Sequence, residues 1–124
     1  MHRNQTKIIT VGGLPIGGAS PVSVQSMCST KTEDIDATLA QIEALTNAGC
    51  DIIRLAVPNE RAARALPSIR RGCKIPMVAD IHFDYKIALA VADAGADCLR
   101  INPGNIGSEA KIREVVAAAK YHDI

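Results

Sequence analysis

The chain has 124 residues, enough for one domain with a hydrophobic core. Its 48% hydrophobic and 22% charged residues are typical of a globular chain and argue against disorder. A net charge of +1 and an aromatic content of 2% provide neither a basic field nor stacking surfaces, so we expect no nucleic acid partner. No apolar run has the length of a membrane span or a secretory signal, so we expect a cytoplasmic protein with no membrane partner.

The first predicted element is a β-hairpin within residues 1–20. Lys7–Val11 and Leu14–Ile16 are extended runs on either side of Gly12-Gly13, a dipeptide that favours a tight turn. The run Val22–Met27 follows and is predicted to be the first strand of the main sheet.

Helices are predicted after each strand of that sheet. Thr30 and Glu33 have the spacing of a capping box, which predicts the start of the first helix. Asn59 and Asp84 are the expected N-caps of the second and third helices, and the last helix is expected after Pro103-Gly104. Apolar residues recur at helical spacing in all four: Ile35, Leu39, Ile42 and Leu45; Ala62, Leu66 and Ile69; Ile87, Val91 and Ala94; Ile112, Val115, Val116 and Ala119.

The remaining strands are predicted at Ile52–Ala56, Met77–Ile81 and Cys98–Asn102. The sequence of Ala48–Leu55 recurs in Ala94–Ile101, so two of the strand-helix units are related by repetition. Strict alternation of strands and helices predicts a parallel sheet with right-handed crossovers. The competing architecture is a doubly wound open sheet, which usually carries a G-x-G-x-x-G turn after its first strand; no such turn follows here. We therefore expect an α/β fold, the first half of a (β/α)8 TIM barrel of about four strand-helix units in residues 21–124.

Alternation of side chains along these strands predicts a polar interior. Arg54 lies on the opposite face from Ile53, and Arg100 lies on the opposite face from Leu99. Asp80 shares a face with His82. Two guanidinium groups inside a barrel require anionic partners, and Arg suits phosphate oxygens. The predicted inward set also includes His82, Asn102, Ser23, Gln25 and Met27.

Two interpretations of the inward arginines remain open on the residues alone. They could bind an anionic ligand such as a phosphate, or they could pair with carboxylates inside the barrel, including ones from the rest of a longer chain. His82 could donate to phosphate, act as an acid or base, or ligate a metal, but with Asp80 it makes only two ligands. The glycine-rich segment 102–107 after the last strand would let backbone amides approach an anion.

The four cysteines give no metal-binding pattern. None of Cys28, Cys50, Cys73 and Cys98 lies in a C-x-x-C pair, so no metal site is predicted in this chain. We interpret them as small buried hydrophobic residues of a protein in a reducing compartment.

Four stretches together resemble the family of 4-hydroxy-3-methylbut-2-enyl diphosphate synthase, the reductive enzyme of the methylerythritol phosphate pathway of isoprenoid biosynthesis. They are Val11–Gly18, Pro21–Met27, Ala79–Tyr85 and Leu99–Gly107. The resemblance implies that 2-C-methyl-D-erythritol 2,4-cyclodiphosphate is the substrate. The substrate-binding positions that it implies in this chain are Arg54, Asp80, His82, Arg100, Asn102, Gln25 and Ser26.

The resemblance covers nearly the whole chain but only the beginning of the family's protein. It implies an oxidoreductase with a [4Fe-4S] cluster, electrons from flavodoxin or ferredoxin, and a homodimer. The cluster ligands and the catalytic residues would lie beyond Ile124, so we expect no catalytic residue here and an isolated chain that is inactive. The family usually has Thr after Met27, whereas this chain has Cys28, with Ser29 and Thr30 as the alternative hydroxyl groups.

Two other functional classes remain as alternatives. One is a different phosphate-binding barrel enzyme, of a pterin- or aldolase-like kind, against which the Ala79–Tyr85 and Leu99–Gly107 motifs argue. The other is a non-catalytic fragment that works only with a partner.

Overall fold

The computed structural model describes residues 2–82 and 84–124, without the side chains at positions 2, 3 and 103. Phe83, part of one of the family-like motifs, lies outside the described residues. The elements in chain order are η1 (His2–Gln5), β1 (Ile9–Val11), β2 (Leu14–Ile16), β3 (Gln25–Met27), α1 (Ile35–Asn47), β4 (Ile52–Val57), α2 (Glu60–Gly72), β5 (Met77–Ile81), α3 (Tyr85–Asp93), β6 (Cys98–Ile101), α4 (Pro103–Ile106) and α5 (Glu109–Tyr121).

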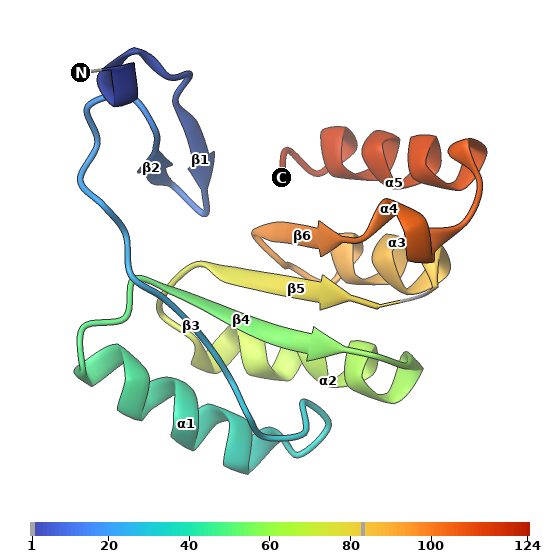
Figure 1. Ribbon diagram of the computed structural model, residues 1–124. Helices are drawn as coiled ribbons and strands as arrows, with labels where there is room; N and C mark the ends of the chain where they lie inside the picture. Colours follow the sequence, from blue (N-terminus) through green and yellow to red (C-terminus); the bar gives the residue numbers. More distant parts are fainter. Residues whose placement is uncertain (1, 83) are drawn as a thin grey trace.

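The predicted hairpin is confirmed. β1 and β2 pair antiparallel, with Val11 opposite Leu14, and the turn between them holds Gly12 and Gly13 at φ 55° and 87°. These positive φ angles are those that a tight hairpin turn requires and that glycine adopts without strain. The hairpin lies at the end of the sheet where the strands begin (Figure 1). There Val11 packs with Ile52 and Val78 in a small apolar cluster of its own.

The main sheet is parallel, with the order β3-β4-β5-β6. Helices α1, α2, α3 and α5 cover one of its faces (Figure 1). The main core fills the space between that face and the helices, with Ile53, Leu55, Leu66 and Ile81 among its fully buried members. The opposite face carries no helix from the described part of the chain. This is the arrangement predicted for half of a (β/α)8 barrel, in which the face without helices would be the interior.

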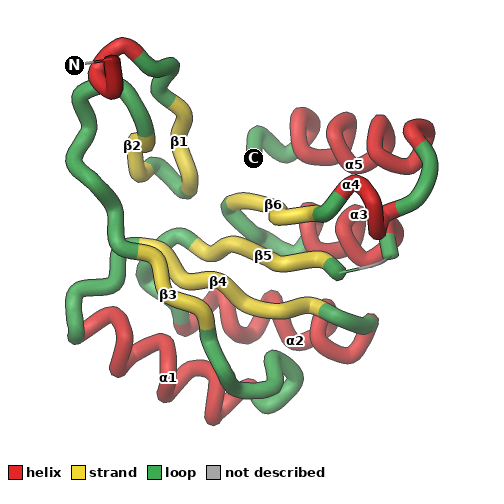
Figure 2. Tube along the Cα trace, in the orientation of Figure 1, coloured by secondary structure: helices red, strands yellow, loops and turns green. Residues whose placement is uncertain are grey.

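The first strand and the first helix are both shorter than predicted. β3 begins at Gln25 because the backbone of Val24 already turns to the loop, where its carbonyl accepts from Asp51 N and its N–H donates to the Asp51 carboxylate at 2.8 Å. Residues 17–24 form the long connection from the hairpin to β3 (Figure 2). The expected capping box at Thr30 and Glu33 is wrong, since Asp34 caps α1 by accepting from Ala37 N.

The other predicted caps are confirmed, while the last helix is divided. Asn59 accepts from Ala62 N at 2.9 Å, and Asp84 accepts from Lys86 N at 2.9 Å. After β6 the chain makes the short helix α4 and then turns at Gly107, with φ 116°, before Ser108 caps α5. Of the apolar residues expected on α5, Val115 is buried and Val116 is exposed.

The sequence repeat has a structural counterpart at the start of two strands. Asp51 and Asp97, equivalent in the two copies, each accept from the backbone at the beginning of the preceding strand segment, Val24 N and Met77 N respectively. The second copy adds an ion pair of 3.0 Å between Asp97 and Arg70. The repeated aspartate therefore ties each loop to the strand next to it, which is an architectural role.

Candidate anion-binding site on the open face of the sheet

Register brings the predicted polar residues of β4, β5 and β6 together. Asp80 is level with Arg100 on β6 and with Ala56 on β4, and paired residues of parallel strands point to the same face. Arg54 lies two residues before Ala56, so its long side chain reaches forward toward Asp80. Because Ala56 carries only a methyl group, space remains beside Asp80 for the Arg54 guanidinium.

One buried carboxylate contacts both arginines. Asp80 Oδ2 accepts from Arg54 Nε at 3.1 Å and from Arg54 Nη2 at 2.5 Å. Its other oxygen, Oδ1, accepts from Arg100 Nη1 at 3.3 Å. His82 Nε2 lies 3.8 Å from Asp80 Oδ2. The side chain of Asp80 is 3% exposed, whereas those of Arg54, His82 and Arg100 are 27%, 36% and 48% exposed.

The cluster has an excess of positive charge. Two guanidinium groups meet one carboxylate, and the described residues place no other carboxylate against either arginine. Each guanidinium has five N–H donors, so both retain donors beyond those directed at Asp80. Partly exposed, cationic and rich in N–H donors, this surface is chemically suited to an oxyanion. The arginines thus pair with an internal carboxylate, as one interpretation predicted, and the other interpretation, an anionic ligand, stays a prediction that their remaining N–H donors allow.

The neighbouring predicted residues divide into two groups. Gln25 and Met27 are level with Ile52 and Arg54 and lie on the open face of β3. Ser26 is level with Ile53, on the helix-covered face, so the structure does not bring it to the cluster. Asn102 directly follows β6 and is exposed, and its Oδ1 accepts from Gly104 N at 3.0 Å as the N-cap of α4. Its amide nitrogen is the part of this side chain that can donate to a ligand.

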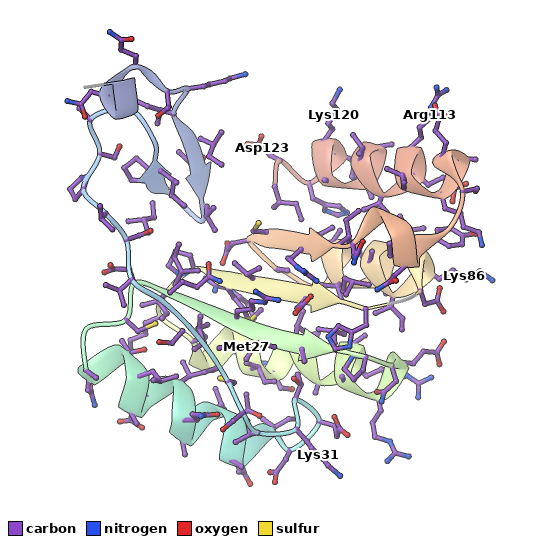
Figure 3. The ribbon with its side chains drawn as sticks, in the orientation of Figure 1. Met27, Lys31, Lys86, Arg113, Lys120 and Asp123 are labelled. Carbon is purple, nitrogen blue, oxygen red and sulfur yellow. The ribbon has the colours of Figure 1, made fainter. Side chains whose placement is uncertain are left out.

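Other basic side chains do not add to this cluster. Lys86 on α3 and Arg113 and Lys120 on α5 point away from the sheet (Figure 3). Arg113 pairs with Glu109 on its own helix at 2.6 Å. Among the described residues of β3 to β6, the cationic side chains are Arg54 and Arg100, which lie on alternate strands.

The cluster is an open surface and not an enclosed pocket. A hollow of about 550 Å³ lies between α1 and α2 on the outer side, lined by residues that include Leu39, Thr46 and Gly72. A smaller one of about 220 Å³ lies between α2 and α3. Neither includes Arg54, Asp80 or Arg100, because the site is formed on one wall of the barrel.

Sequence reasoning missed the residues that fix the loop between β3 and α1. Thr32 is buried, and its hydroxyl donates to the carbonyl of Ala56 at 2.5 Å, next to the arginine cluster. Gln41 Oε1 accepts from Ser29 N at 2.9 Å, and the hydroxyl groups of Thr30 and Thr38 are 2.8 Å apart. The one available signal was Thr38, a polar residue at helical spacing from the apolar positions of α1.

The cysteines do not fit an iron–sulfur cluster. Among the described residues no group of three His, Cys, Asp or Glu side chains could hold a metal ion. Cys50 Sγ donates to the carbonyl of Ile52 at 2.9 Å, and Cys73 Sγ to that of Ile75 at 3.3 Å. Burial, with a smaller contribution from the neighbouring Cys73 and Cys50 thiols, raises the pKa of the Cys28 thiol to about 11, whereas a cluster ligand must be a thiolate. No reaction step can be assigned to a cluster on these residues.

The fold and the site define part of an α/β-barrel protein whose open, interior face carries two arginines around a buried carboxylate. The chain belongs to the GcpE TIM-barrel domain family, whose sequence model matches residues 6–124. A protein of Acinetobacter baumannii (strain AYE), named 4-hydroxy-3-methylbut-2-en-1-yl diphosphate synthase (flavodoxin), is 61% identical over the whole chain. A protein of the same name from Maridesulfovibrio salexigens is 55% identical. The chain covers 33% of the first relative and 35% of the second, so it spans about a third of their length.

Solved structures support the fold alone. A structure of mandelate oxidase with 3,3-difluoro-2-hydroxy-3-phenylpropionic acid has a TM-score of 0.61 at 15% identity. The match covers 94% of this chain and 59% of the mandelate oxidase chain. The Y128F mutant of mandelate oxidase with (S)-mandelic acid gives a TM-score of 0.59 over the same shares. No described helix is long and apolar enough to cross a membrane.

Proposed function

We propose that this chain forms the diphosphate-binding part of a 4-hydroxy-3-methylbut-2-enyl diphosphate synthase. The complete protein would reduce 2-C-methyl-D-erythritol 2,4-cyclodiphosphate in isoprenoid biosynthesis. The observation that carries the proposal is the pair of arginines from β4 and β6, both held on the buried carboxylate of Asp80 and both with N–H donors to spare. The names of the 55–61% identical relatives support the choice of substrate.

In this proposal the residues of the chain bind and orient the substrate. Arg54 and Arg100 donate to the diphosphate oxygens from two strands, so the anion lies across the carboxyl ends of β4 to β6. His82, 36% exposed beside the cluster, and the amide nitrogen of Asn102 are suited to donate from the adjacent loops. Gln25 lies further along the same face on β3. Ser26 is left out because it lies on the helix side.

The proposal assigns binding to this chain and reduction to parts of the protein outside it. A [4Fe-4S] cluster would be held by residues outside this chain, since its own cysteines do not fit one. Electrons would come from flavodoxin, as the names of the relatives suggest, or from ferredoxin. We further propose that residues 1–20 form a hairpin unit and residues 21–124 the barrel part, and that the complete protein is a homodimer. A cytoplasmic location is part of the proposal and is supported by the four free thiols.

Calorimetry with the cyclodiphosphate tests the proposal in the complete protein that contains this sequence. A charged hydrogen bond contributes ~1.5–3 kcal/mol, so Arg54→Ala and Arg100→Ala should each weaken binding roughly tenfold to a hundredfold. Arg113→Ala is the matched control, because its side chain is exposed on α5 and points away from the sheet. Unchanged affinity in both cluster variants would contradict the proposed site.

A further inference from the structure

Asp80 is poorly placed to be a ligand contact, although it lies at the centre of the proposed site. Its carboxylate carries the same sign of charge as a diphosphate, so direct contact between the two is unfavourable. Both of its oxygens already accept from guanidinium groups, and only 3% of its side chain is exposed. Its contacts are instead with the cationic residues on the strands to either side.

The geometry of those contacts fixes the relative position of two long side chains. Arg54 donates from Nε and Nη2 to Oδ2, and Arg100 donates from Nη1 to Oδ1, so each oxygen holds a different guanidinium. Without the carboxylate, the two like charges would repel each other. Arg100, 48% exposed on an open face, would then be free to rotate into water. Fixing such side chains before binding removes the entropy loss that binding would otherwise carry.

We propose that Asp80 is a positioning residue, which holds the two guanidinium groups in place for a diphosphate before the ligand arrives. The inference rests on the proposed function, because it assumes that the arginines bind a diphosphate. It makes Asp80 act through Arg54 and Arg100 and assigns it no contact with the ligand.

Inorganic pyrophosphate is the probe that separates this role from its rivals. Removing a negative charge beside an anion site strengthens anion binding if charge alone matters, so Asp80→Asn would then bind pyrophosphate more tightly. If Asp80 instead accepted a hydrogen bond from a hydroxyl of the natural substrate, pyrophosphate affinity would not change. The positioning role predicts that pyrophosphate binds about tenfold more weakly.

Asp80→Glu is the second variant and retains the charge. It moves the carboxylate outward by one methylene, so the positioning role predicts weaker pyrophosphate binding here also. A role limited to charge balance predicts wild-type binding. Because Glu still neutralises the arginines, this variant keeps the test decisive if Asp80→Asn does not fold, which thermal unfolding would reveal.

A double-mutant cycle with Arg100→Ala completes the experiment, with calorimetry on the complete protein. If Asp80 acts through Arg100, the effects of Asp80→Glu and Arg100→Ala are not additive, and Asp80→Glu weakens binding less in the Arg100→Ala background. The positioning role would be overturned if the Asp80 variants bound pyrophosphate as tightly as the unmutated protein or more tightly, or if the two effects were additive. The proposed function would still stand in that case, provided that the unmutated protein bound pyrophosphate. Absence of pyrophosphate binding by the unmutated protein would instead contradict the proposed function itself.

Discussion

On β4, Ile53 and Leu55 are fully buried against the helices, whereas Arg54 between them keeps 27% of its side chain exposed on the opposite face. The same contrast recurs on β5, where Ala79 and Ile81 face the core and Asp80 faces the arginines. Helices cover the first face along its length, so its residues contribute mainly to stability. The open face packs against the hairpin through Ile52 and Val78, and further along it carries Arg54, Asp80 and Arg100. The helix-covered face of each strand therefore carries residues that stabilise the fold, and the open face carries the candidate binding residues.

The largest expected effect comes from the helix-covered face. Leu55→Ala removes a fully buried side chain from the main core, so it should lower the free energy of unfolding by ~2–5 kcal/mol. Met27→Ala is the matched control on the open face, where the side chain is 46% exposed, and should change it by less than ~1 kcal/mol. Denaturant unfolding measures both. Equal decreases in the free energy of unfolding of the two variants would contradict the difference between the two faces.

An intermediate effect is expected where the hairpin covers the open face. Val78 is buried with Ile52 and Val11 at the beginning of the strands, so Val78→Ala should destabilise the protein by ~1–3 kcal/mol. Val22→Ala, at a position that is 74% exposed, should have an effect within ~0.5 kcal/mol. Thermal or denaturant unfolding distinguishes the two. If Val78→Ala left the free energy of unfolding unchanged, the packing of the hairpin against the sheet would not contribute to stability.

The smallest expected effect is a pH dependence from the thiol at the end of β3. Burial raises the pKa of Cys28 from 9.0 to about 11, so the folded state keeps its proton at pH values where the unfolded state has lost it. The contribution to stability is complete below pH 9 and is lost as the pH rises toward 11, by at most ~3 kcal/mol. Cys28→Ala should flatten that part of the unfolding profile. If the pH profile of unfolding for Cys28→Ala were identical to that of the wild type, the Cys28 thiol would not be shielded from water in the folded state.

Much of the site could be predicted because it depends on short-range rules. Alternation along each strand placed Arg54 and Arg100 on the open face, and it placed Gln25 there while putting Ser26 on the other. Ser26 entered the predicted site only through the family resemblance, and the structure does not bring it there. The N-caps Asn59 and Asp84 follow from local side-chain chemistry, and both are confirmed.

The failures arose where distant contacts compete with local preference. Thr30 and Glu33 have the spacing of a capping box, but Gln41 and Thr38 on α1 hold the backbone and hydroxyl of Thr30 in a loop, and the helix begins after Asp34. The first strand lost its beginning because the Asp51 carboxylate binds the backbone at Val24. Both errors involve a side chain that is remote in sequence and takes over a backbone group.

The amino-acid sequence by itself determined the order of strands and helices, the face on which each strand residue lies, and the family. Periodicity and turn chemistry are properties of neighbouring residues, so they can be recognised without coordinates. Only the tertiary structure decided that the carboxylate of Asp80 bonds to both Arg54 and Arg100, with a different oxygen for each. That arrangement depends on the register between three strands and on the space left by Ala56, and register is fixed by packing across the whole sheet.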